Sequence, residues 1–135
     1  MKIDHKGRLK LSASHLATLG TQFFITSEDG EFVRIYPLDV WNEIEKQLLR
    51  LCLHNKNRQK LLARAKYFGR AVKMDRQGRV LIPAILRKSA QMRGEVDVLD
   101  YQNYVEVWNH TRFVHNLKNS PVTAQDESAL NRLAG

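Results

Sequence analysis

Two short turn segments carry the residues whose types and spacing are best suited to chemistry. Asp4 and Arg8 stand four positions apart around Gly7, and Asp75 and Arg79 repeat the arrangement later in the chain. An arginine presents a planar fork of donors that can take the O6 and N7 atoms of guanine together or clamp a phosphate. The same spacing also lets each aspartate pair with its arginine and hold the turn. The two interpretations are compatible, because a carboxylate can orient an arginine whose other donors face DNA.

The residues around the second turn indicate how its arginine is positioned. Residues 70–74 alternate between polar and apolar side chains, which predicts a half-buried strand. Gly78 can adopt a positive φ, so the chain can reverse there. Residues 80–82 are apolar and favour a second strand, and Pro83 suits the first position of a helix. The predicted unit is a strand, a glycine turn, a strand and a helix, and a two-stranded ribbon of this kind fits the major groove of DNA.

A second copy of this unit begins near the start of the chain. Asp4 aligns with Asp75 at an offset of 71, and the turn glycine and arginine follow in the same register. After a slip of one residue, residues 32–36 align with residues 104–108 at an offset of 72. Matches this long and in the same order predict two copies of one module. A module of about 70 residues is marginal on its own, so we expect the two halves to share a core.

Basic residues in and around the two units are candidates for contact with nucleic acid. The candidates for base or phosphate contacts are Lys6, Arg8, Lys10, Arg70, Lys73, Arg76, Arg79, Arg87 and Lys88. The residues expected to form the turns and to orient these side chains are Asp4, Gly7, Asp75 and Gly78. Arg87 lies one turn into the helix that follows Pro83, so it could equally pair with Asp75 or with a backbone carbonyl.

Positive charge is distributed unevenly along the 135 residues. The whole chain has a formal net charge of +8, yet residues 56–93 contain twelve lysines and arginines against the single acid Asp75. A stretch this basic is either a solvated face or a surface that binds a polyanion. As that polyanion, nucleic acid is favoured over an acidic protein. No apolar run approaches the ~20 residues required to span a membrane, so we expect no membrane partner.

The sequence offers little support for catalysis or for a metal site. The five histidines show no H-x-x-x-H spacing and have no cysteine pair beside them. The turn glycines stand singly rather than in a phosphate-binding loop. Cys52 stands among leucines, which predicts a buried thiol rather than a reactive thiolate. We therefore expect neither an enzyme nor a cofactor, and a lone cysteine is consistent with a cytoplasmic protein.

The two Asp-x-x-Gly-Arg hairpins, and the Val-Leu-Ile-Pro-x-x-x-Arg run after the second, resemble the MraZ family of bacterial transcriptional regulators. The resemblance covers residues 1–118, including the strand pairs that end in an aromatic residue and a helix. Its strongest part comprises Asp75, Gly78, Arg79, Pro83, Arg87, Val107, Trp108 and Phe113. In the first half, Ser12 stands in place of the proline and Leu16 in place of the later arginine. Only three residues precede Asp4, which is short for a first strand.

The resemblance implies an α+β fold in which two pseudo-symmetric AbrB-like halves interleave into a double-split β-barrel with helices packed outside. It implies a DNA-binding repressor of the division and cell-wall gene cluster, which binds promoter direct repeats through both hairpins and is cytoplasmic and nucleoid-associated. It also implies a ring-like homo-oligomer, with Leu49 and Leu53 of a helix expected over residues 37–53 as interface candidates. The alternative is an antitoxin-like protein of the same fold that binds a protein partner as well as DNA.

The repeat also suggests how the chain is organised. The expected segments are a first AbrB-like half (1–53), a connecting helix (54–69), a second AbrB-like half (70–118) and a polar C-terminal tail (119–135). The connecting helix itself is expected over 58–68, and a weak helix is expected within the tail over 128–133.

Overall fold

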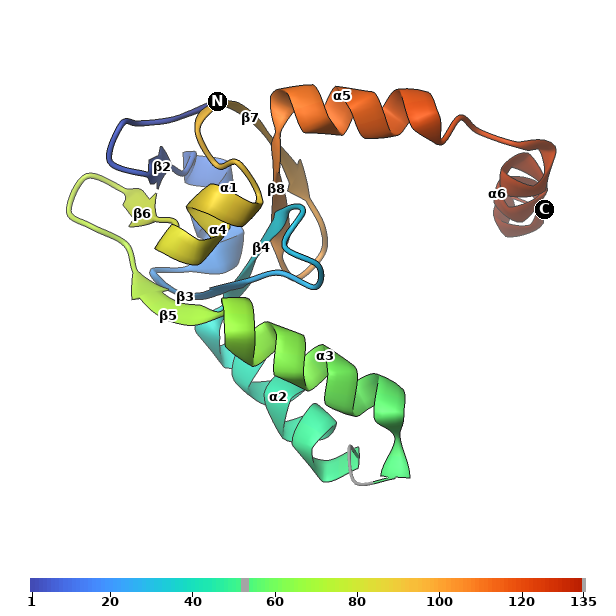
Figure 1. Cartoon of the computed structure of the whole chain (residues 1–135), viewed down its shortest axis with the longest axis horizontal. Helices are drawn as coiled ribbons and strands as arrows, with labels where there is room; N and C mark the ends of the chain where they lie inside the picture. The colour runs from blue at the N-terminus through green and yellow to red at the C-terminus, as the bar shows by residue number, and fades with distance from the viewer. Residues whose placement is uncertain (52–53, 135) are drawn as a thin grey trace.

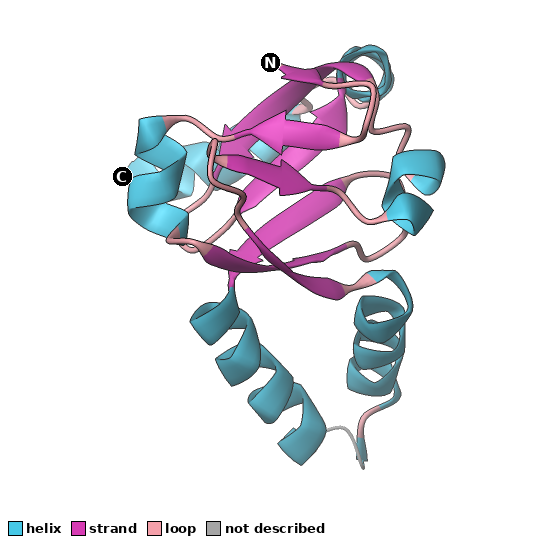
Figure 2. Ribbon diagram, turned by 90° about the vertical axis from the view of Figure 1, so that its left-hand side faces the viewer, coloured by secondary structure: helices cyan, strands magenta, loops and turns pink. Residues whose placement is uncertain are grey.

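The computed structural model describes residues 1–51 and 54–134, and its centre is a single sheet of eight strands. Neighbouring strands are antiparallel, and the order is β5-β3-β4-β8-β7-β1-β2-β6. The strands are β1 (Lys2–Ile3), β2 (Arg8–Lys10), β3 (Gln22–Thr26), β4 (Val33–Pro37), β5 (Arg70–Lys73), β6 (Arg79–Leu81), β7 (Gly94–Asp100) and β8 (Val105–Asn109). The end strands β5 and β6 are joined by the second turn, so the sheet curls into a nearly closed barrel (Figure 2).

The two sequence repeats contribute interleaved parts of this sheet. Strands β1–β4 belong to the first repeat and β5–β8 to the second, yet β1 pairs with β7 and β5 pairs with β3. Equivalent residues of the two repeats face one another at two places, Leu9 opposite Val80 and Arg34 opposite Glu106. A local two-fold axis through these two pairs relates the halves. This arrangement confirms the predicted α+β fold of two pseudo-symmetric halves in an interleaved barrel.

One hydrophobic core fills the barrel and draws on both repeats. Side chains alternate between the two faces of a strand, so every second residue points inward. Phe23 and Ile25 of the first repeat are fully buried, as are Val80, Val105 and Val107 of the second. Burying a side chain of this size stabilises the fold by about 1.5–3 kcal/mol. Because the inward-facing residues of each half pack against those of the other, the two halves stabilise one another.

Helices surround the barrel and extend from it. They are α1 (Ala13–Leu19), α2 (Leu38–Leu51), α3 (Lys56–Phe68), α4 (Ala84–Ser89), α5 (His110–Asn119) and α6 (Ala124–Ala134). Helices α2 and α3 form a hairpin that projects from the barrel, while α5 leads away to α6 (Figure 1). Trp41 anchors α2, because its buried ring stacks on Phe24 with the centroids 4.6 Å apart. Within the described residues, none of these helices combines the length and the apolar character needed to cross a membrane.

The start of α2 differs from the sequence-based expectation. The helix begins at Leu38 rather than Pro37, because Pro37 pairs with Phe23 as the last residue of β4. Cys52, which is predicted to be a buried thiol, and Leu53, which is predicted to be an interface residue, lie outside the described residues.

Capping side chains lengthen α3 and α6 beyond the expected helices. Helix α3 starts at Lys56, because the Asn55 side chain accepts the backbone N–H groups at the helix start. The tail helix was expected only over 128–133, but α6 is longer. Its start is fixed by reciprocal hydrogen bonds, in which Thr123 N–H donates to Asp126 Oδ2 at 2.9 Å and Asp126 N–H donates to Thr123 Oγ1 at 3.2 Å.

Candidate nucleic-acid interface

The first turn is held by hydrogen bonds to a single carboxylate. Asp4 Oδ1 accepts the backbone N–H groups of Lys6 and Arg8, both at 2.9 Å, and Asp4 Oδ2 accepts Arg8 Nε–H at 2.8 Å. The Gly7 N–H donates to the Asp4 carbonyl at 3.0 Å, and Gly7 has a φ of 84°, a conformation that favours glycine. The aspartate therefore shapes the turn and also fixes one edge of the arginine.

The second turn repeats these contacts. Asp75 Oδ1 accepts the backbone N–H groups of Gln77 at 2.8 Å and of Arg79 at 2.9 Å, and Asp75 Oδ2 accepts Arg79 Nε–H at 2.9 Å. The interpretation that each aspartate pairs with its own arginine is therefore confirmed in both copies. Only Nε of each arginine is used in this way, and no described residue bonds to the terminal amino groups of Arg8 or Arg79. The outer edge of each fork is left for a ligand.

The same hydrogen bonds stabilise the charged form of both aspartates. The backbone N–H of Arg8 has the largest effect on Asp4, and together with the Arg8 guanidinium it lowers the pKa of Asp4 from 3.8 to about 2. The backbone N–H of Arg79 likewise lowers the pKa of Asp75, with smaller effects from the Gln77 N–H and the Arg79 guanidinium. Both carboxylates are ionised at neutral pH and hold the arginines in place.

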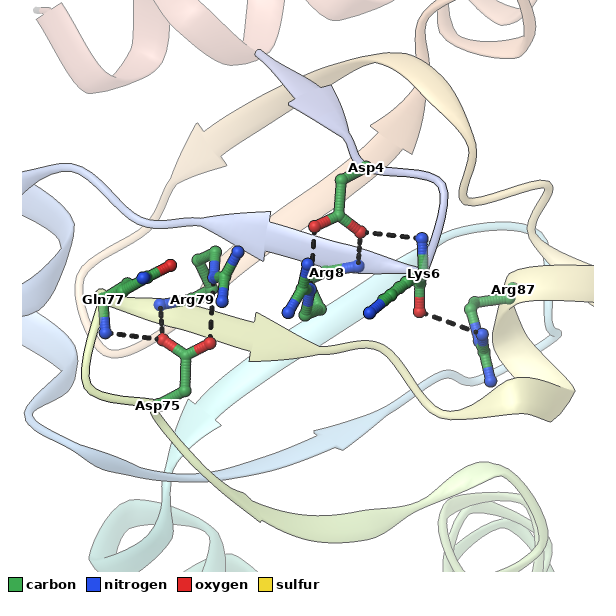
Figure 3. A network of polar contacts seen from close by, with 7 residues as sticks. All are labelled: Asp4, Lys6, Arg8, Asp75, Gln77, Arg79 and Arg87. Carbon is green, nitrogen blue, oxygen red and sulfur yellow. Dashed lines mark hydrogen bonds and ion pairs between the residues drawn. The ribbon is translucent and has the colours of Figure 1, made fainter.

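The two arginines lie on the outer face of a ribbon formed by β2 and β6, with the turns at opposite ends (Figure 3). The central pair of this ribbon, on the two-fold axis, is buried, so the residues on either side of it point outward. The register places Arg8 opposite Leu81 and Lys10 opposite Arg79. Like charges directly opposite one another destabilise an antiparallel pair. An anion bound on this face would offset that repulsion.

Arg87 supports the first turn from helix α4. Its Nη1 donates to the Lys6 carbonyl at 3.2 Å (Figure 3), and its stem lies so close to Gly7 that an added Cβ would collide with it. Of the two structural alternatives considered above, the carbonyl contact is the one formed, and pairing with Asp75 is not. The first repeat has a leucine at the equivalent position, and no atom of the described residues lies within 4 Å of a Cβ added at Gly78.

The remaining candidates lie around the ribbon rather than on it. Lys6 and Arg76 are exposed in the two turns. Lys73 and Arg70 are exposed on β5, on the other side of the second turn from the ribbon, and Lys88 is exposed on α4. The structure thus brings three of the predicted cations together on one face and places the others at its periphery.

Leu81 belongs to the outer face of the ribbon and was missed by the sequence analysis. It is 48% exposed and lies opposite Arg8. An apolar side chain between cations suits contact with the methyl group of thymine. The alternation of side chains along the strand could have identified Leu81, because Arg79 and Leu81 flank the buried Val80 and must point the same way.

One contact outside the ribbon has the residue types of a hydrolase. His15 Nδ1 lies 2.9 Å from Ser12 Oγ, and its Nε2 lies 3.1 Å from Asp100 Oδ1. However, the Ser12 hydroxyl accepts the backbone N–H of His15 as the N-cap of α1, so its contacts serve to start a helix. No group of three potential metal ligands occurs in the part of the chain that the structure describes.

Known proteins of similar sequence belong to the same family that the turn motifs resemble. A family model described as "MraZ protein, putative antitoxin-like" matches residues 69–133. A protein of Acidobacterium capsulatum named "Transcriptional regulator MraZ" is 47% identical over 133 residues, covering 96% of this chain and 91% of the relative. Proteins of the same name from Koribacter versatilis (39% over 137 residues, 98% and 93%) and Moorella thermoacetica (34% over 114 residues, 82% and 78%) are also similar. The chain belongs to the MraZ family.

Proposed function

We propose that this chain is a transcriptional regulator that binds double-stranded DNA sequence-specifically through the β2–β6 ribbon. The observation that carries the proposal is the cluster of Arg8, Lys10 and Arg79 on one outer face, with both arginines oriented by carboxylates. A two-stranded ribbon fits the major groove, and a bidentate arginine–guanine contact contributes about 1–3 kcal/mol of discrimination. The names of the curated relatives support the same function.

The proposed roles follow from where each side chain lies. Arg8 and Arg79 read base edges with their terminal amino groups, and Asp4 and Asp75 position them. Arg87 keeps the first turn in shape through the Lys6 carbonyl. The phosphate contacts come from the exposed cations on and around the ribbon, which are Lys6, Lys10, Lys73 and Arg76.

We further propose that the chain acts as a repressor of the division and cell-wall gene cluster by binding direct repeats in its promoter, as the family resemblance implies. Several copies of the chain in a ring would each reach one repeat, and the linkage would raise the overall affinity. Exposed apolar side chains on the α2–α3 hairpin support self-association, namely Leu49, Leu51 and Leu61, which are 40–48% exposed. Light scattering at micromolar concentration should show an oligomer, and a purely monomeric protein would rule out the ring.

An equilibrium binding measurement tests the DNA-binding function. The wild-type protein is titrated into labelled DNA from upstream of its gene and into a shuffled duplex of the same length and composition, at one fixed salt concentration. A specific regulator is expected to bind the upstream DNA at least about 10³-fold more tightly. Equal affinity for both duplexes would refute sequence-specific binding.

The description of the matching family model favours a second candidate, an antitoxin-like protein that binds a protein partner as well as DNA. Helix α6 could serve as the partner-binding segment, because all of its residues are exposed, including Leu130 at 65% and Leu133 at 88%. Co-purification of a stoichiometric protein partner, lost when α6 is deleted, would support this candidate. Isolation of the chain with no bound protein would favour the first.

A further inference from the structure

The outer face of α3 carries a dense positive charge that the ribbon site does not use. The helix contains five lysines and arginines and no acidic residue. Its inner face is fixed, because Leu62 and Ala65 are buried and the Ala65 carbonyl accepts the Thr26 hydroxyl at 3.0 Å. The lysines at exposed positions on the solvent side are Lys56, Lys60 and Lys66.

These lysines have no ionic partner in the described part of the chain. The salt bridge of this helix joins Arg64 Nη1 to Asp29 Oδ1 at 3.3 Å, and no described carboxylate pairs with the three lysines. Lys56 and Lys60 are four residues apart on one side of the helix, a spacing at which like charges repel. The helix therefore retains an unfavourable arrangement of charge that an external anion would relieve.

An exposed aromatic side chain lies on the same face. Tyr67 is 70% exposed. It follows Lys60 by two helical turns, so it lies on the same side of α3 as Lys56 and Lys60. Its ring contacts the edge of Phe68, with the centroids 5.0 Å apart, and Phe68 packs against the core. Lysine and tyrosine side chains both donate to phosphate oxygens in protein–DNA complexes. The composition of this face therefore matches a phosphate backbone.

We infer that α3 is a second DNA-contact surface, which binds backbone phosphates of the duplex beside the stretch under the ribbon. The inference rests on the DNA-binding function proposed above. Strand β5 leads directly from α3 to the second turn, and it carries an exposed cation at each end, Arg70 next to the helix and Lys73 next to the turn. This continuity with the ribbon favours DNA over an acidic protein as the partner.

The placement of α3 determines what the contact contributes. The helix is about 20 Å long at 1.5 Å per residue, and it projects away from the barrel (Figure 1). The phosphates that it reaches therefore lie outside the bases contacted by the hairpins. Because phosphate contacts carry no sequence information, this surface adds affinity for any duplex and leaves the sequence preference unchanged.

A charge-matched pair of variants tests the inference. The test variant combines Lys56→Gln, Lys60→Gln and Lys66→Gln, which keep good helix propensity. The control combines Lys46→Gln, Lys118→Gln and Arg132→Gln, which remove the same net charge from exposed positions on other helices. Each protein is titrated into the upstream duplex and the shuffled duplex over a series of salt concentrations, after its melting temperature has been compared with that of the wild type.

The test variant should bind both duplexes about tenfold or more weakly at 0.1 M salt. Its plot of log affinity against log salt should be shallower by about 2–3 units, since each lost phosphate contact removes about 0.9. The control should stay close to the wild type.

Equal behaviour of the two variants would overturn the inference while leaving the ribbon proposal intact, and would make an acidic protein the candidate partner. Failure of the wild type to bind either duplex would overturn both. If the triple variant melts early, Lys60→Gln against Lys46→Gln gives the same comparison.

Discussion

Replacing the turn glycines by alanine should have unequal effects, although the two turns have the same motif. Gly7 and Gly78 have φ values of 84° and 77°, so an alanine at either position is strained by about 1–2 kcal/mol. At Gly78 that strain is the whole cost, since a Cβ there meets no described atom within 4 Å. At Gly7 the Cβ collides with the Arg87 stem and lies 2.8 Å from its Nη1. The Arg87 side chain must therefore move and lose its hydrogen bond to the Lys6 carbonyl, which adds about 1.5–3 kcal/mol to the cost of the substitution.

Urea unfolding at neutral pH measures both costs. Gly7→Ala should lower the free energy of unfolding by about 1.5–3 kcal/mol more than Gly78→Ala does. In an Arg87→Ala background the collision is absent, so the two alanine substitutions should cost the same. Equal costs in the wild-type background, or a difference that persists without the arginine, would refute the role assigned to Arg87.

Three other perturbations have defined outcomes. Asp4, whose pKa is lowered to about 2, and Asp75, whose pKa is also lowered, give stability that is present above pH 3.8 and is lost as the pH falls through their folded-state pKa values, so thermal melts below pH 3.8 should show the loss. Asparagine at both positions should flatten the dependence of the melting temperature on pH, and an unchanged dependence would show that these aspartates do not cause it. Deleting residues 121–135 should leave the melting temperature and DNA affinity nearly unchanged, because every described residue there is exposed; loss of a cooperative melt would contradict this. Glu106→Gln should destabilise by about 1.5–3 kcal/mol, because the half-buried Arg34 loses a charged partner 3.2 Å away, and a wild-type midpoint in urea would disprove it.

The repeat and its two turns could be predicted because their structure is encoded by neighbouring residues. Asp75, Gly78 and Arg79 lie within five positions, and the carboxylate bonds to backbone N–H groups two and four residues ahead. Both turns form the same contacts within five residues, so the pairing of aspartate with arginine could be anticipated. The interleaved barrel was anticipated from the family resemblance, because the repeat alone indicates which residues are equivalent and not which of them meet.

The contacts between the repeats could not be predicted from the sequence. Arg87 and Lys6 are 81 positions apart, and only the exchange of hairpins between the halves brings them together. Arg34 and Glu106, 72 positions apart, are equivalent residues of opposite charge that meet on the two-fold axis. Local periodicity does not specify a cross-strand partner, so neither contact has a signal in the pattern of either segment.

The forks of Arg8 and Arg79 are proposed to read base edges, and the most direct test replaces both arginines by lysine. Lysine keeps the positive charge but cannot make the bidentate contact. The quantity to measure is the ratio of affinities for the upstream duplex and its shuffled counterpart, in a variant whose melting temperature shows that it is folded. Loss of two bidentate contacts at about 1–3 kcal/mol each should lower that ratio by about 30-fold or more, with binding to the shuffled duplex nearly unchanged. A folded variant that discriminates between the duplexes as well as the wild type would contradict the claim.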